Sequence, residues 1–165
     1  MTGACLWLCG LPGSGRSTIA AQVARDLGHR GVAVELLDTA EARDELVLGH
    51  FHSDAVSDSD LARLAFVARL LARQGVIAVV AADSGKDALR QDLSAKFDHF
   101  VVVHVDTPAE LCAARGGAGS DAARFEAPLA PDLRVITHDR SPAASAAQVV
   151  SYLEAAGLIP TGFVS

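Results

Sequence analysis

A glycine-rich run at residues 10–17 is the part of the sequence whose spacing most directly predicts chemistry. It reads GLPGSGRS and matches the phosphate-binding pattern G-x-x-x-x-G-K-[ST] at every required position except the lysine. Its glycines allow several backbone N–H groups to point at one anion, such as the β-phosphate of a nucleotide. We therefore predict a nucleotide cradle; the alternative is a turn that merely joins a strand to a helix. The residues concerned are Gly10, Gly13, Ser14, Gly15, Arg16, Ser17 and Thr18, with the Ser17 hydroxyl as a ligand of Mg²⁺.

Arg16 stands where the pattern has its lysine. An ammonium is a compact point charge that can follow a moving phosphoryl group, whereas a guanidinium is larger, planar and geometrically demanding. Two interpretations stay open. Either Arg16 still clamps the phosphates as a bulkier catalytic cation, or the site binds nucleotide and turns over poorly.

The elements that must position this run alternate between apolar segments and segments with helical periodicity. Such alternation predicts a parallel sheet with crossover helices, an α/β fold. We expect strands at 4–9, 32–38, 76–83, 100–106 and 133–138. We expect helices at 17–27, 41–47, 58–73, 86–96 and 141–156, one that opens with Thr107 as its cap, and a loop at 115–131. The cradle then follows the first strand and opens the first helix, as its pattern requires.

Composition limits the classes of protein and partner. The 165 residues are 50% hydrophobic and 21% charged, which is typical of one globular domain spanning 1–165. A formal net charge of -6 leaves no basic stripe for a nucleic-acid backbone. The apolar stretches are shorter than the roughly 20 residues that cross a bilayer, so we expect no membrane partner.

Cys5, Cys9 and Cys112 form an odd set without metal-ligand spacing. Cys5 and Cys9 are an even number of residues apart on one expected strand, so we expect both on one face as core residues. The first ten residues lack a basic leader. We therefore expect reduced thiols in a cytoplasmic protein without a signal peptide.

Several stretches, in the same order along nearly the whole chain, resemble the adenylylsulfate kinase family, which phosphorylates the 3′-hydroxyl of adenosine 5′-phosphosulfate with ATP. LWLCGLPGSGRSTIA is similar to its opening strand and cradle, LLDTAEARDEL to L-D-G-D-N-x-R, and HSDA to F-S-D-A. VDTPAELCAAR resembles V-D-T-P-x-x-x-C-x-x-R, and FEAP resembles Y-E-A-P. The resemblance implies a three-layer α/β/α P-loop NTPase fold with strand order 2-3-1-4-5. It also implies ATP and Mg²⁺ as cofactors, a small-molecule acceptor and a homodimer.

The resemblance also implies roles for individual residues. Arg115 resembles the arginine that packs on the nucleotide near the lid and could stack on adenine, although a solvated surface arginine is the alternative. Arg43 sits where the family has its first substrate arginine. The other acceptor-binding candidates are His52, Asp54, Asp60 and Ser84.

The departures from the family fall on the residues that contact its acceptor. Ala40 replaces the second acid of D-G-D, His52 replaces a stacking phenylalanine, and Ser57 and Asp60 stand in place of R-x-x-N. The lid is cut to GGAGSDAAR, without lysines. Each lost charge-assisted hydrogen bond is worth about 1.5–3 kcal/mol, so we expect a different acceptor, smaller or less anionic.

Two carboxylates could supply the missing chemistry. Asp38 and Asp83 lie at the carboxyl ends of expected strands, where open α/β sheets bind their ligands. Asp83 replaces an apolar residue of the family's I-S-P turn. We predict Asp38 as the base or the water-mediated Mg²⁺ partner, and Asp83 as the second candidate, with a helix cap as the alternative for Asp83.

The leading hypothesis is ATP-dependent phosphorylation of a hydroxyl on a small metabolite. The cradle holds ATP, Arg16 and Mg²⁺ offset charge on the transferring group, and Asp38 helps position the acceptor. The competing hypothesis is a non-catalytic relative that binds a nucleotide, or nothing, and serves a partner protein. A third hypothesis is an NTP-hydrolysing switch.

Overall fold

The computed structural model describes residues 2–39, 56–83, 85–117 and 120–162. The elements in chain order are β1 (Ala4–Cys9), α1 (Arg16–His29), β2 (Val34–Asp38), α3 (Asp58–Arg73), β3 (Ile77–Ala81), α4 (Asp87–Ser94), β4 (Phe100–Asp106), α5 (Ala109–Ala114), α6 (Ser120–Arg124), β5 (Leu133–Ile136) and α7 (Pro142–Ala155). None of the helices in these ranges is both long enough and apolar enough to span a bilayer.

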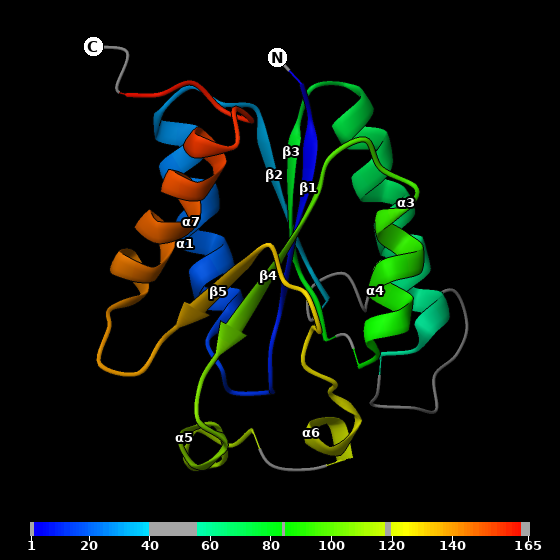
Figure 1. Cartoon of the computed structure of the whole chain (residues 1–165), viewed down its shortest axis with the longest axis vertical. Helices are drawn as coiled ribbons and strands as arrows, with labels where there is room; N and C mark the ends of the chain where they lie inside the picture. Colours follow the sequence, from blue (N-terminus) through cyan, green and yellow to red (C-terminus); the bar gives the residue numbers. More distant parts are fainter. Residues whose placement is uncertain (1, 40–55, 84, 118–119, 163–165) are drawn as a thin grey trace.

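The five strands form one parallel sheet in the order β2-β3-β1-β4-β5, which confirms the expected architecture. Helices α1 and α7 cover one face, and α3 and α4 cover the other (Figure 1). The short helices α5 and α6 lie beyond the carboxyl ends of the strands. Because β1 is central, the cradle that follows it opens in the middle of this edge, where ligands of open α/β sheets bind.

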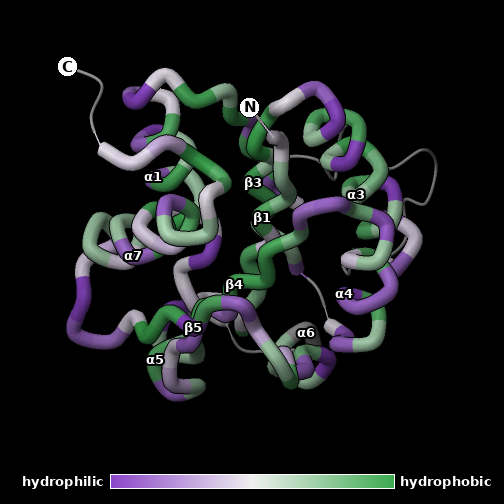
Figure 2. Tube along the Cα trace, turned by 45° about the horizontal axis from the view of Figure 1, so that its top comes forward, coloured by the Kyte–Doolittle hydropathy of each residue, from purple (hydrophilic) through white to green (hydrophobic). Residues whose placement is uncertain are grey.

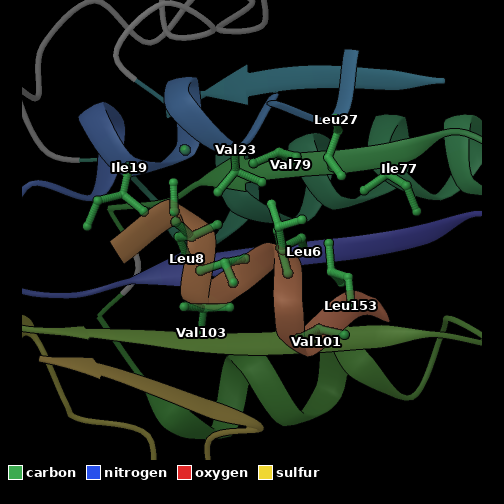
Figure 3. Packing of buried hydrophobic residues seen from close by; sticks show 14 of the residues in the cluster. Leu6, Leu8, Ile19, Val23, Leu27, Ile77, Val79, Val101, Val103 and Leu153 are labelled. Carbon is green, nitrogen blue, oxygen red and sulfur yellow. The ribbon is translucent and has the colours of Figure 1, made fainter. Parts of the chain in front are cut away.

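Strand β1 is buried along its whole length, since β3 and β4 pair with it on either side. Leu6 and Leu8 point to the α1 and α7 face, where Val23 and Leu153 pack on them (Figure 3). Cys5, Trp7 and Cys9 belong to the second core, under α3, so the two cysteines share one face as predicted. The hydropathy colouring accordingly shows an apolar centre between helices with mixed surfaces (Figure 2).

Burial decides the chemistry of these thiols. It raises the pKa of Cys9 to about 11, and it raises the pKa of Cys5 further still. Both thiols are therefore protonated at neutral pH and act as small core residues rather than nucleophiles.

The expected element boundaries differ from the structure at several ends. Helix α1 runs to His29 instead of 27, and it ends where Gly31 takes a φ of 73° while the Val32 N–H donates to the Leu27 carbonyl at 3.1 Å. β2 begins two residues later than expected, and β3 and β5 each end two residues earlier. Helix α4 is likewise shorter than expected at both ends.

The expectation of an uninterrupted loop at 115–131 was wrong, because residues 120–124 form α6. This helix is too short to show a periodic apolar stripe, although alanine and arginine favour helix. The helix expected at 41–47 lies outside the described residues.

Candidate nucleotide and acceptor site

The cradle connects the end of β1 to α1 by way of two glycines in the left-handed region. Gly13 has a φ of 80° and Gly15 a φ of 93°. A side chain on Gly13 would also clash with α5, because its Cβ would lie 2.7 Å from the Cys112 carbonyl oxygen. Both the backbone conformation and the neighbouring helix therefore require glycine at position 13.

The N-terminus of α1 is left available to an anion. Gly15 is its N-cap, no side chain of the described residues caps it, and its first turn holds no acidic residue. By contrast, the hydroxyls of Ser57 and Ser141 cap α3 and α7. The first N–H groups of α1 and the exposed hydroxyls of Ser17 and Thr18 are thus placed for an anionic ligand.

Two threonines support the cradle from the ends of β4 and β5. The Thr107 hydroxyl donates to the Ser14 carbonyl oxygen at 2.9 Å and is in hydrogen-bond contact with the Thr137 hydroxyl. Thr107 is therefore not the helix cap that we expected: Pro108 is the N-cap of α5. The sequence carries no local signal for this role, because Thr107 and Ser14 are 93 positions apart.

The carboxyl end of α5 closes against the cradle. The Arg115 Nη1 atom lies 3.4 Å from the Gly13 carbonyl oxygen. Gly117 is buried, and a Cβ there would lie 1.9 Å from the Pro12 carbonyl oxygen. Arg115 thus lies beside the glycine turn with an exposed side chain, and its nucleotide contact stays a prediction. Gly117 packs against the same turn and was not among the predicted site residues.

A cavity of about 370 Å³ adjoins the cradle on the α7 side. Its cations are Arg115 and Arg140, and among the described residues that line it none is acidic. The Ser14 and Ser145 hydroxyls are buried in its lining and have no hydrogen-bond partner among the described residues. The remaining lining residues are Gly13, Gly15, Thr18, Ile19, Thr137 and Pro142.

Arg16 turns away from that cavity and toward the edge of the sheet. Its Nη1 donates to the Gly10 carbonyl oxygen at 2.7 Å and to the Ala82 carbonyl oxygen at 3.0 Å. Its other terminal nitrogen forms an ion pair with Asp83. The side chains of the pair are 12% and 32% exposed, so a guanidinium and a carboxylate meet in partly desolvated surroundings.

Asp83 is held in turn by Thr39. The Thr39 hydroxyl oxygen accepts from the Asp83 N–H at 3.3 Å, and its single proton is within reach of both Asp83 Oδ2, at 3.2 Å, and the Ala81 carbonyl oxygen, at 3.3 Å. The alternative that Asp83 caps a helix is wrong, because Lys86 is the N-cap of α4. The Asp87 N–H in that first turn donates instead to a Glu126 carboxylate oxygen at 3.2 Å.

A second cavity, of about 310 Å³, lies on the other side of the cradle, and Arg16 and Asp83 belong to it. It is also lined by Lys86, Arg124 and Phe125, which were not among the predicted site residues. The FEAP match was the available signal for Phe125. The other lining residues are Gly10, Pro12, Val56, Ser57, Asp58 and Gly85.

Buried Arg90 fixes the FEAP segment at this cavity. Its side chain is 1% exposed, hydrogen-bonds the Glu126 carbonyl oxygen, and lies 3.4 Å from Asp87. Its guanidinium carbon is 5.8 Å from the centre of the Phe125 ring. Arg90 therefore holds the Phe125 ring in the lining of the second cavity.

Other predicted residues are placed away from the two cavities or outside the described chain. Asp38 is half-buried at the end of β2, opposite Ala81 in the sheet, and lines neither cavity. The Asp60 carboxylate accepts from the Ser57 N–H at 3.0 Å within the capping box of α3, and it pairs with Arg63 at 3.1 Å. The predicted residues outside the described ranges are Arg43, His52, Asp54 and Ser84.

A family model described as adenylylsulphate kinase matches residues 2–122. The chain belongs to the adenylylsulphate kinase family. The observed sheet order agrees with the P-loop kinase fold of this family.

The relatives of this adenylylsulphate kinase family member are longer than the chain itself. The chain is 33% identical to the probable bifunctional SAT/APS kinase 2 of Sorangium cellulosum, over 97% of this chain and 30% of that protein. It is 38% identical to the adenylyl-sulfate kinase of Synechococcus sp. (strain JA-3-3Ab), over 71% and 66%, respectively. The chain therefore spans less than a third of the first relative and just under two thirds of the second.

Solved structures of the same family agree in fold. The Mycobacterium tuberculosis APS kinase CysC, solved in complex with AMPPNP and APS, has a TM-score of 0.81 and 32% identity, over 93% of this chain and 98% of that one. A hexameric APS kinase from Thiobacillus denitrificans has a TM-score of 0.77 and 25% identity, over 98% of this chain and 30% of that one.

Proposed function

We propose that this protein transfers a phosphoryl group from ATP to a hydroxyl of a small metabolite. The observation that carries the proposal is the glycine cradle at the start of α1, which no described side chain caps and which opens into a cavity whose described charged lining residues are two arginines. Backbone N–H groups and cations complement a polyphosphate. The buried, unpartnered Ser14 and Ser145 hydroxyls would gain hydrogen-bond partners from a bound nucleotide.

Mg²⁺ fits the oxygen donors near the cradle. The Ser17 hydroxyl is exposed in the first turn of α1, and Asp38 stands at the carboxyl end of β2, whereas the Asp83 carboxylate beyond the neighbouring strand β3 is already paired with Arg16. Oxygen ligands of this kind are the ones that Mg²⁺ prefers, and the ion would offset negative charge on the phosphates. Arg16 would add a second positive charge from the acceptor side. Asp38 lines neither cavity, so we propose it as the water-mediated partner of Mg²⁺ rather than as the base.

The acceptor belongs in the 310 Å³ cavity beside Arg16. Its charged lining is mixed, with Arg16, Lys86 and Arg124 against Asp58 and Asp83. A mixed lining favours a polar acceptor of low net charge, whereas adenosine phosphosulfate is strongly anionic. We therefore propose an acceptor that is smaller or less anionic than adenosine phosphosulfate.

Nucleotide binding is tested first by thermal unfolding with and without Mg²⁺ and ATP or ADP. A ligand present at 100 times its Kd stabilises by about 2.7 kcal/mol. For a domain of this size that amounts to a rise in Tm of about 5–10 °C. No shift at millimolar nucleotide would remove every function that depends on the cradle.

The acceptor is tested by an ADP-release assay with adenosine phosphosulfate and a panel of hydroxyl compounds. We expect little or no turnover with adenosine phosphosulfate and measurable turnover with another acceptor. Brisk phosphorylation of adenosine phosphosulfate would show that the argument from lost acceptor contacts is wrong.

A second candidate function is a nucleotide-binding protein that has lost turnover, and the Arg16–Asp83 ion pair favours it. An arginine bound to a carboxylate is less able to follow a transferring phosphoryl group than a lysine. In that case Arg16→Lys should raise phosphotransferase activity from a low base. A fall in activity would mean that the site works through the guanidinium.

A further inference from the structure

The Arg16 guanidinium is bound by backbone and side-chain groups of the protein itself. Two carbonyl oxygens at the ends of β1 and β3 accept from it, at 2.7 and 3.0 Å, and the Asp83 carboxylate pairs with it. Thr39 is buried, with 5% of its surface exposed, and its hydroxyl contacts Asp83 through two hydrogen bonds. The carboxylate is therefore fixed in place, and so is the guanidinium.

Carboxylates and phosphates compete for a guanidinium, because both bind the same planar set of N–H donors. Arg16 is the first residue of α1 and follows the cradle directly, so a phosphate bound there would be its neighbour. A phosphate that engages Arg16 fully must weaken the contact to Asp83. Both members of this pair also depart from the motifs that the chain otherwise follows.

We propose that Asp83 is a positioning residue that competes with nucleotide phosphate for Arg16 and thereby sets the affinity of the cradle for the phosphate tail. Thr39 takes part by holding the carboxylate in its competing position. The inference rests on the proposed nucleotide binding, and it adds a residue that determines how strongly ATP is held.

The test is a double-mutant cycle with Asp83→Asn and Arg16→Gln, with the Kd of MgATP measured by calorimetry at constant salt. In the presence of Arg16, Asp83→Asn should tighten MgATP about tenfold, because the guanidinium is released to the phosphates. In the Arg16→Gln background, Asp83→Asn removes only the direct repulsion between the Asp83 carboxylate and the phosphates of ATP. It should therefore lower the Kd of MgATP by about threefold or less. Asp83→Glu keeps the charge and should restore an affinity near that of the wild type.

Thr39→Val provides a second route that keeps both charges and nearly the same volume. Thr39→Val should lower the Kd of MgATP about threefold when Arg16 is present and should not change it in the Arg16→Gln background. This variant decides the question if Asp83→Asn does not fold, which cooperative thermal unfolding will show. A merely structural role of Asp83 would lower Tm without making the change in Kd depend on residue 16.

The outcomes separate this inference from the proposed function. If Asp83→Asn changes the Kd of MgATP equally with and without Arg16, the inference is overturned. The proposed function still stands in that case, provided that the wild type binds MgATP. Binding that appears only in Asp83→Asn supports the inference and overturns nucleotide use by the wild type. If neither the wild type nor any of these variants binds MgATP, both are overturned.

Discussion

The two cavities beside the cradle are built in different ways. In the part of the chain that the structure describes, the cavity on the α7 side is lined by turn residues, hydroxyls and two arginines, without an acid. The cavity on the α4 side is lined by three basic and two acidic residues, from segments spread between positions 10 and 125. The first cavity depends on a short stretch of backbone, and the second depends on long-range contacts between side chains.

The helices that begin at these cavities show the same contrast. Helix α1 starts without an acid in its first turn and without a cap from any described side chain, whereas α3 starts with a capping box and two aspartates, Asp58 and Asp60. An anion is stabilised at the first helix and repelled at the second. The contrast supports the proposal that the phosphates of a nucleotide bind at α1 and that the acceptor is less anionic than adenosine phosphosulfate.

Gly13→Ala should have the largest effect, on the nucleotide side. The new Cβ would lie 2.7 Å from the Cys112 carbonyl oxygen at a φ of 80°. We expect loss of the nucleotide-dependent rise in Tm, together with a destabilisation larger than that of the control. Gly31→Ala is the control, because its φ of 73° is similar and nothing lies within 4 Å of its added Cβ; it should cost about 1–2 kcal/mol. A full nucleotide shift in Gly13→Ala would contradict the cradle assignment.

Arg115→Ala should have the next largest effect. Its guanidinium lies beside the Gly13 carbonyl oxygen in the wall of the nucleotide cavity. Loss of a stacked cation should weaken ATP and ADP alike, by about tenfold, as measured by calorimetry. Arg25→Ala, an exposed arginine on α1 that contacts Gln22 at 2.6 Å, is the matched control and should change neither affinity. Unequal effects on ATP and ADP would place Arg115 at the phosphates instead.

Asp60→Ala tests the acceptor side and should act mainly on stability. The Asp60 carboxylate accepts two hydrogen bonds from Ser57 in the capping box. The N–H of residue 60 still donates to the Ser57 hydroxyl in this variant, so the cost should stay below the about 1 kcal/mol of a lost N-cap. Ser141→Ala removes the N-cap of α7 and should give the larger fall in Tm, about 2–4 °C. If Asp60→Ala also raises the KM of the acceptor tenfold and Ser141→Ala does not, Asp60 binds the acceptor directly.

His104 should produce the smallest effect, through pH. Its ring lies 6.0 Å from that of Phe125, and burial lowers its pKa below the usual 6.5. The unfolded chain then binds a proton that the folded chain does not, so stability is full above pH 6.5 and is lost as the pH falls toward the lowered pKa. Urea unfolding between pH 5 and pH 8 should show this slope, and His104→Gln should reduce it. An unchanged slope in the variant would assign it to other groups.

Sequence patterns located most of the fold. Strands β1 and β4 and helix α3 have the predicted bounds, because each is an uninterrupted apolar run or an amphipathic stripe with clear ends. Helix α6 was missed, since five residues are too few for periodicity. The strand order came from the resemblance and not from periodicity, which does not specify which strands become neighbours.

The sequence by itself determined the cradle, because the φ angles of a short turn depend on which of its residues are glycines. Only the tertiary structure decided that Arg16 meets Asp83, that Thr107 supports Ser14, and that Lys86, Arg124 and Phe125 share a cavity. Such contacts join residues as many as 93 positions apart. They depend on how strands and helices pack, and no local pattern of residues encodes that packing.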